Sequence, residues 1–92
     1  MSDTGTPAHV TASAVVFAGR AQLRSVVVGT AASGQTVKLH NCATTGAAAS
    51  GNLVAQIDLG AAGSYLFGDA VFDAGIVAIV SGGTPDITVV FR

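Results

Sequence analysis

His40 and Cys42 are the residues whose types and spacing come nearest to a metal site. Side chains two residues apart on a strand point to the same side, so this pair supplies half of a tetrahedral zinc site, with His9 as a possible third ligand. A structural zinc site needs four ligands, and the chain has a single cysteine. We therefore interpret the pair as part of a polar strand face with an inert thiol, and we predict no metal site.

Acidic residues offer a second kind of chemistry. Asp69 and Asp73 flank a short apolar run, and Asp58 and Asp86 lie at other strand ends, where paired carboxylates could bind calcium or act as acid and base. Aspartate is also a common turn residue because its side chain accepts hydrogen bonds from nearby backbone N–H groups, and we favour that interpretation. No serine has a nucleophile-elbow setting, and no glycine motif joins a strand to a helix. We therefore predict no catalytic residue, no cofactor and no enzymatic activity.

Arg20, Gln22 and Arg24 alternate along one predicted strand and so share one of its faces. Two interpretations of this stripe stay open. The guanidinium groups could pair with carboxylates of a neighbouring subunit, to which their planar shape is suited. Alternatively, the stripe is a solvated strand face that protects a sheet edge from further pairing.

The amino-acid composition limits the classes of function that this chain can have. Half of the 92 residues are apolar, but only 10% are charged, against roughly 25% in an average soluble domain. So little surface charge suggests that part of the surface is covered by other proteins. The net charge of −1 and the absence of a clustered basic face argue against nucleic acid as a partner. No apolar run is long enough to cross a membrane, and the N-terminus lacks a secretory pattern, so we expect synthesis in a cytoplasm.

The elements that position these residues are short strands. Residues 1–7 are small and polar and contain Gly5 and Pro7, so we predict an N-terminal arm followed by one domain over residues 8–92. In the domain, about seven apolar or alternating runs are separated by glycine-rich turns, which is typical of a sandwich or barrel. They span residues 8–17, 20–28, 35–42, 52–59, 64–72, 75–81 and 86–92. We predict an all-β fold, an antiparallel β-sandwich or a jelly-roll-like arrangement, with a bulge or bend at Gly68 and Asp69.

Three segments carry a resemblance to a known group of proteins. They are Gly19-Arg20 before a Leu-Arg-Ser-Val-Val strand, the run Val37–Asn41, and Phe72 with Gly75-Ile76-Val77 before a closing Thr-Val-Val-Phe strand. In this order the chain resembles the small all-β virion structural proteins of tailed bacteriophages. The resemblance spans most of residues 19–92 and consists of strand patterns.

The resemblance implies a capsid decoration or cement protein, which binds the major capsid protein or other virion subunits on the capsid surface. It also implies a homo-oligomer, with a trimer favoured. We expect the contacts to come from the arm, the arginine stripe and the loop 43–51. The residues expected there are Ser2, Asp3, Thr4, Pro7, Arg20, Gln22, Arg24 and Thr45.

Two alternative functions remain. The domain could be a tail or neck adaptor or a fibre component. It could also be a carbohydrate- or receptor-binding module, since sandwiches often carry such sites on their loops. The absence of tryptophan weighs against a sugar-binding platform.

Overall fold

The chain forms eight strands and two single-turn 3-10 helices in a computed structural model that describes residues 5–92. None of the helices in this part of the chain has the length and apolarity needed to span a bilayer. The strands are β1 Thr6–Val10, β2 Ala14–Ala18, β3 Ala21–Thr30, β4 Thr36–Asn41, β5 Leu53–Asp58, β6 Gly63–Phe72, β7 Gly75–Ser81 and β8 Asp86–Phe91. The 3-10 turns η1 Thr45–Ala47 and η2 Ser50–Asn52 lie in the connection between β4 and β5.

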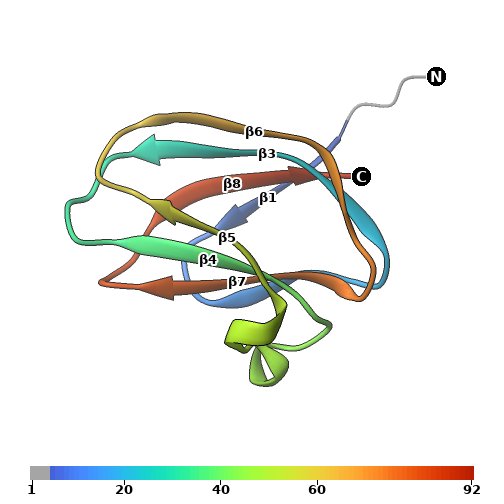
Figure 1. Ribbon diagram of the computed structural model, residues 1–92. Coiled ribbons are helices and arrows are strands. Elements are labelled where there is room, and N and C mark those ends of the chain that lie inside the picture. The colour runs from blue at the N-terminus through green and yellow to red at the C-terminus, as the bar shows by residue number, and fades with distance from the viewer. Residues whose placement is uncertain (1–4) are drawn as a thin grey trace.

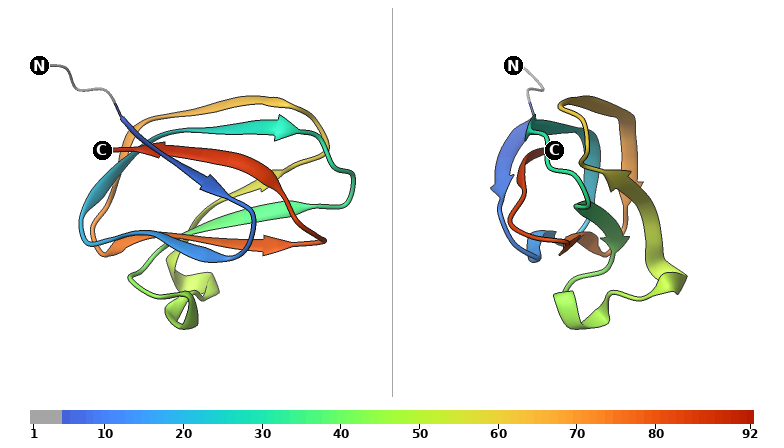
Figure 2. Two further views of the ribbon diagram at one scale, coloured as in Figure 1. Left: turned by 180° about the vertical axis from the view of Figure 1, so that it is seen from behind. Right: turned by 90° about the vertical axis from the view of Figure 1, so that its left-hand side faces the viewer.

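The strands form two antiparallel four-stranded sheets, with the orders β1-β8-β3-β6 and β2-β7-β4-β5. Within them, β4 pairs with β5, β3 with β6, β2 with β7 and β1 with β8, as in one long hairpin ribbon. The ribbon is rolled up so that β3 also pairs with β8, and β4 with β7. This is an eight-stranded jelly roll, which confirms the predicted fold class. Figures 1 and 2 show the two stacked sheets.

The alternation of apolar residues explains the core. In β8, Ile87 and Val89 face inward and are fully buried, whereas Thr88 and Val90, which alternate with them, are only partly buried. The inward rows of both sheets meet in one cluster in which the largest fully buried side chains are Phe72, Leu23, Leu39, Leu59, Ile76 and Ile87. Burying each such side chain contributes about 1.5–3 kcal/mol. These buried side chains pack the two sheets against each other, and this packing fixes the positions of the residues on the outer face of each sheet.

The predicted strand over residues 8–17 is wrong in one respect, because the structure divides it between the two sheets. The chain bends at Thr11–Ser13 and passes from β1 to β2, and Ser13 Oγ accepts a hydrogen bond from Val80 N at 2.8 Å. Val10 and Val16 pack on the same core from either side of this corner, so the apolar pattern continues through it. No glycine or proline marks the bend.

Thr6 and Pro7, which were predicted to belong to the N-terminal arm, are part of β1 and pair with Phe91 and Val90 of β8. Proline fits here because β1 is an edge strand, where a missing N–H can face solvent. Residues 1–4 lie outside the described residues.

The predicted bulge at Gly68 and Asp69 is confirmed. Leu23 of β3 pairs with Ala70, but Ser25 pairs with Leu66, so three residues of β6 oppose one residue of β3. Both Gly68 and Asp69 have positive φ values, 62° and 64°. Among non-glycine residues, aspartate tolerates this conformation better than most.

Strand β7, with the sequence GIVAIVS, is apolar on both faces. Ile76 and Ala78 face the core, while Val77 faces outward and is nevertheless fully buried. Its cover comes from within the chain, since η1 packs beside β7 and His40 lies opposite Val77 on β4. The apolarity of this strand is therefore accounted for inside the domain.

Candidate functional site

The predicted arginine stripe lies partly on the solvent side of the β1-β8-β3-β6 sheet, here called the first-sheet face. Gln22 and Arg24 project from β3, which is an inner strand, so the stripe does not protect a sheet edge. Arg20 precedes β3 and lies 3.8 Å from Asp73, with both side chains largely exposed. The carboxylates that pair with these arginines therefore belong to the same chain.

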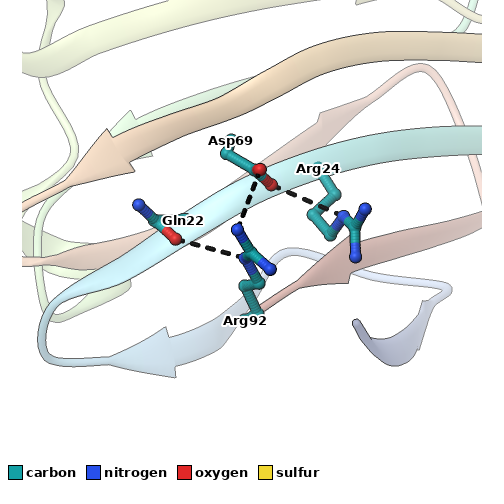
Figure 3. A network of polar contacts seen from close by, with 4 residues as sticks. All are labelled: Gln22, Arg24, Asp69 and Arg92. Carbon is teal, nitrogen blue, oxygen red and sulfur yellow. Dashed lines mark hydrogen bonds and ion pairs between the residues drawn. The ribbon is translucent and has the colours of Figure 1, made fainter. Parts of the chain in front are cut away.

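Asp69 is the centre of a charged network on the first-sheet face (Figure 3). Its Oδ2 accepts a hydrogen bond from Arg92 Nη2 at 3.1 Å, and its Oδ1 lies 3.4 Å from Arg24 Nε. Arg92 Nε also donates to Gln22 Oε1 at 3.3 Å. About a third of each charged side chain is exposed, so water weakens these ion pairs but the groups remain oriented.

The bulge of β6 positions Asp69 in this network. Three residues of β6 fill the space of one, and the left-handed backbone at Gly68 and Asp69 brings the carboxylate over β3 between Arg24 and Arg92. Gly68 and Asp69 marked the bulge in the sequence, but the contact of Asp69 with Arg92 arises from the fold, because these two residues are 23 positions apart.

Exposed apolar side chains lie beside the network. Leu66 and Val71 on β6 are 84% and 44% exposed, and both lie on the first-sheet face. A shallow hollow of about 400 Å³ lies between Leu66 and β8 and is lined by Arg24, Ser25, Leu66, Gly68, Asp69 and Val90. Gly5 lies against Val90 and Arg24 so closely that an added Cβ would collide with Val90. The chain therefore enters the domain at the edge of this hollow.

A second polar cluster on the first-sheet face joins three strands. Asp86 of β8 is bonded through Oδ1 to His9 Nε2 of β1 and accepts through Oδ2 from the Thr30 hydroxyl of β3, both at 2.8 Å. The hydrogen bond from Thr30 and the one with His9 lower the pKa of the Asp86 carboxyl below its usual value of 3.8. His9 is therefore engaged on this sheet, away from His40 and Cys42 on the other.

The outer face of the second sheet carries a buried cluster instead. His40 was predicted to point outward to solvent, but it is only 5% exposed, because the loop with η1 and η2 folds over it. Its Nδ1 lies 2.8 Å from Asn52 Oδ1 and 3.0 Å from Ala49 O. Asn52 also accepts from Ala49 N through Oδ1 and donates to Ala47 O through Nδ2. One histidine and one asparagine thus fix the loop.

The predicted contact residues fall in different places. Pro7, Gln22 and Arg24 lie on the first sheet, and Arg20 lies at its end. Thr45 lies on η1 at the second sheet, so a flat partner cannot contact all of them at once. Ser2, Asp3 and Thr4 are outside the described residues. Sequence reasoning missed Asp69 as the partner of the stripe, and it missed Leu66, which is the most exposed large apolar side chain within residues 5–92.

Candidate metal ligands are also separated. Cys42 is buried after the end of β4, and its thiol donates to Thr44 O at 3.4 Å. Within residues 5–92, no three histidine, cysteine or acidic side chains gather as a ligand set.

Comparison with known proteins gives this chain no relative: no family model, no curated protein and no solved structure matches it.

Proposed function

We propose that this domain is a non-enzymatic structural protein of a tailed bacteriophage, which decorates the capsid and stabilises it by packing its first-sheet face on shell subunits. The partners are the major capsid protein or neighbouring virion subunits, and the place of action is the capsid surface. Each copy adds a modest contact, and many copies on a symmetric shell together raise the barrier to separation of capsomers.

The observation that carries the proposal is Leu66, which is 84% exposed and lies next to Arg24 and Asp69 on one sheet face. Apolar side chains surrounded by polar groups are typical of protein interaction surfaces. Only 10% of the residues are charged, so the few ionic groups on this face lie on an otherwise largely uncharged surface.

The arginines of the first-sheet face support the same function. Arg24 and Arg92 are held by Asp69, so little side-chain entropy remains to be lost when a partner carboxylate approaches them. Arginine is also enriched at interfaces relative to the rest of protein surfaces. The network therefore holds the two arginines in fixed orientations for a partner carboxylate, and Leu66 provides apolar surface that a partner can bury.

Substitution of Leu66 by aspartate tests the proposal. Phage particles stripped of the protein are incubated with wild-type chain or with Leu66→Asp, and occupancy and the temperature of shell disruption are measured. Wild-type chain raises the disruption temperature, and Leu66→Asp binds at least about tenfold more weakly, because docking buries an unpaired carboxylate. Val54→Asp is the matched control, because Val54 is 48% exposed on the second sheet, and it binds like wild type.

Equal disruption temperatures with and without the protein would overturn the proposal, as would equal weakening by the two aspartate variants. Counting copies per particle separates head from tail. Hundreds of copies support the capsid surface, whereas a few dozen or fewer place the chain in the tail or neck and contradict the decoration role.

A further inference from the structure

The charged groups of the first-sheet face lie at its two opposite ends. Asp86, at the start of β8, lies at one end, and its side chain is 48% exposed. Arg92, directly after β8, lies at the other end with Arg24, where both guanidinium groups contact the carboxylate of Asp69 (Figure 3). Arg92 O accepts from Gln22 N within the sheet, so the group of Arg92 that rises over the face is its guanidinium. One end therefore presents a carboxylate, and the other presents guanidinium groups.

The middle of the first-sheet face carries no acidic side chain, lysine or arginine on strands β8, β3 and β6. Two outward-facing rows cross these strands there, and the residues are Val90, Ser25 and Leu66 in one row and Thr88, Val27 and Ser64 in the next. Between the two rows lies Val89, which faces the core. Asp86 and Arg92 are each three residues from Val89 along the chain, so each lies about 10 Å from the middle, in opposite directions.

Because the two ends are equally far from the middle, the face is complementary to a copy of itself that is turned end to end. A twofold axis that crosses the strands at Val89 stacks β8 on β8 of a second copy in the reverse direction. Arg92 then lies over Asp86 of the second copy, and Asp86 lies over Arg92 of that copy. The same axis stacks β6 on β6 and places the two Leu66 side chains one residue to either side of it. Reciprocal contacts of this kind define a twofold homodimer interface.

From this charge complementarity we propose that the first-sheet face binds the same face of a second copy of the chain, in a twofold dimer with two Arg92–Asp86 ion pairs. Between its charged ends the face is about 20 Å long, and its four strands make it about 19 Å wide, so each copy buries roughly 400 Å². This is about half of what each partner buries in a standard interface, so we expect a dissociation constant on the order of 100 μM. The dimer does not depend on the proposed function, but both use this face, so dimerisation and docking on a shell exclude each other.

Sedimentation equilibrium of the purified full chain tests the dimer. As the concentration rises to about tenfold the expected dissociation constant, the average mass should approach twice the mass of the chain. Association should weaken about threefold between about 0.05 M and about 0.5 M salt, because salt screens the ion pairs at the two ends.

A charge exchange tests the end-to-end arrangement. Arg92→Glu and Asp86→Lys each place like charges opposite each other at both ends of the dimer, so each variant alone should associate at least about fivefold more weakly than wild type. In an equimolar mixture, opposite charges face each other again at both ends. Dimers with one chain of each variant should therefore form with an affinity within about threefold of wild type. Circular dichroism checks that both variants fold.

Matched controls come from the second sheet. Lys38→Glu and Asp58→Lys change the net charge by the same amounts, and both residues are exposed on strands β4 and β5. Asp58 also accepts a hydrogen bond, from Gly60 N, so its replacement matches the loss of hydrogen bonds at Asp86. Each control variant should dimerise like wild type, and mixing the two should bring no gain in affinity.

A wild-type chain that sediments as a monomer or a trimer at every concentration would contradict the proposal. So would a mixture of Arg92→Glu and Asp86→Lys that associates no better than either variant alone, or a control mixture that gains as much. None of these measurements involves phage particles, so their failure would leave the test of capsid binding unaffected.

Discussion

The polar side chains on the outer faces of the two sheets differ in their exposure to water. On the first sheet, Asp69 pairs with Arg24 and Arg92, and about a third of each side chain is exposed to water. On the second sheet, His40 is buried and is hydrogen-bonded to the side-chain amide of Asn52. A buried network fixes one conformation because its groups have no water to replace a lost partner, whereas exposed ion pairs contribute little to folding. The second face should therefore matter for stability and the first for contacts.

The largest expected effect is at the buried cluster. Asn52→Ala removes one of the two partners of His40 Nδ1, the acceptor for Ala49 N and the donor to Ala47 O, so we expect a loss of roughly 1–3 kcal/mol in the free energy of unfolding. Urea denaturation measures it. Asn52→Asp keeps both acceptor functions and loses only the donor, so its loss should be smaller. If Asn52→Ala is as stable as wild type, the second face contributes no more to stability than the first.

A smaller effect is expected at the charged network. Asp69→Asn keeps a residue type that tolerates positive φ but removes the charge that faces Arg24 and Arg92. Because the pairs are partly exposed, the loss should be below about 1 kcal/mol, and it should shrink further in 0.5 M salt. Denaturation of both chains at low and high salt provides the measurement. If Asp69→Asn lost as much free energy of unfolding as Asn52→Ala, the two faces would not differ in their contribution to stability.

The smallest effect concerns pH and the cluster of Asp86. The folded pKa of Asp86 lies below its unfolded value, so the stability it contributes is complete above the unfolded pKa and is lost as pH falls through the folded pKa. Thr30→Val removes the hydrogen bond that is the main cause of the lowered pKa. We expect the variant to lose less stability than wild type between pH 5 and pH 2.5, as followed by denaturation curves. Identical losses would show that Thr30 does not hold the carboxylate.

Local patterns predicted the strands and the bulge because alternation and turn residues act over a few positions. Seven predicted runs lie at the positions of the eight strands, and Gly68 with Asp69 marked the bulge. The corner at Thr11–Ser13 was missed because it carries no glycine or proline and the core continues across it.

Contacts between distant residues could not be predicted from the sequence. The burial of His40 depends on Asn52, which is 12 positions away, and the network of Asp69 depends on the sheet order that places β3 between β6 and β8. The expected contact residues were chosen by polarity, so Arg24 and Thr45 were grouped although the fold puts them on different sheets. Function itself remains a prediction from composition, resemblance and the exposed face.

The bulge affects whether another chain can add a strand to the first sheet at its β6 edge. Strand β6 is ten residues long and lies at an edge of its sheet, where unpaired N–H and C=O groups invite another chain to add a strand. At residues 67–69 the spacing of these groups is interrupted, so an incoming strand finds two short segments in place of one continuous ladder. Sheet extension from one copy to the next, the route to fibrils, is therefore hindered at the strand that exposes Leu66.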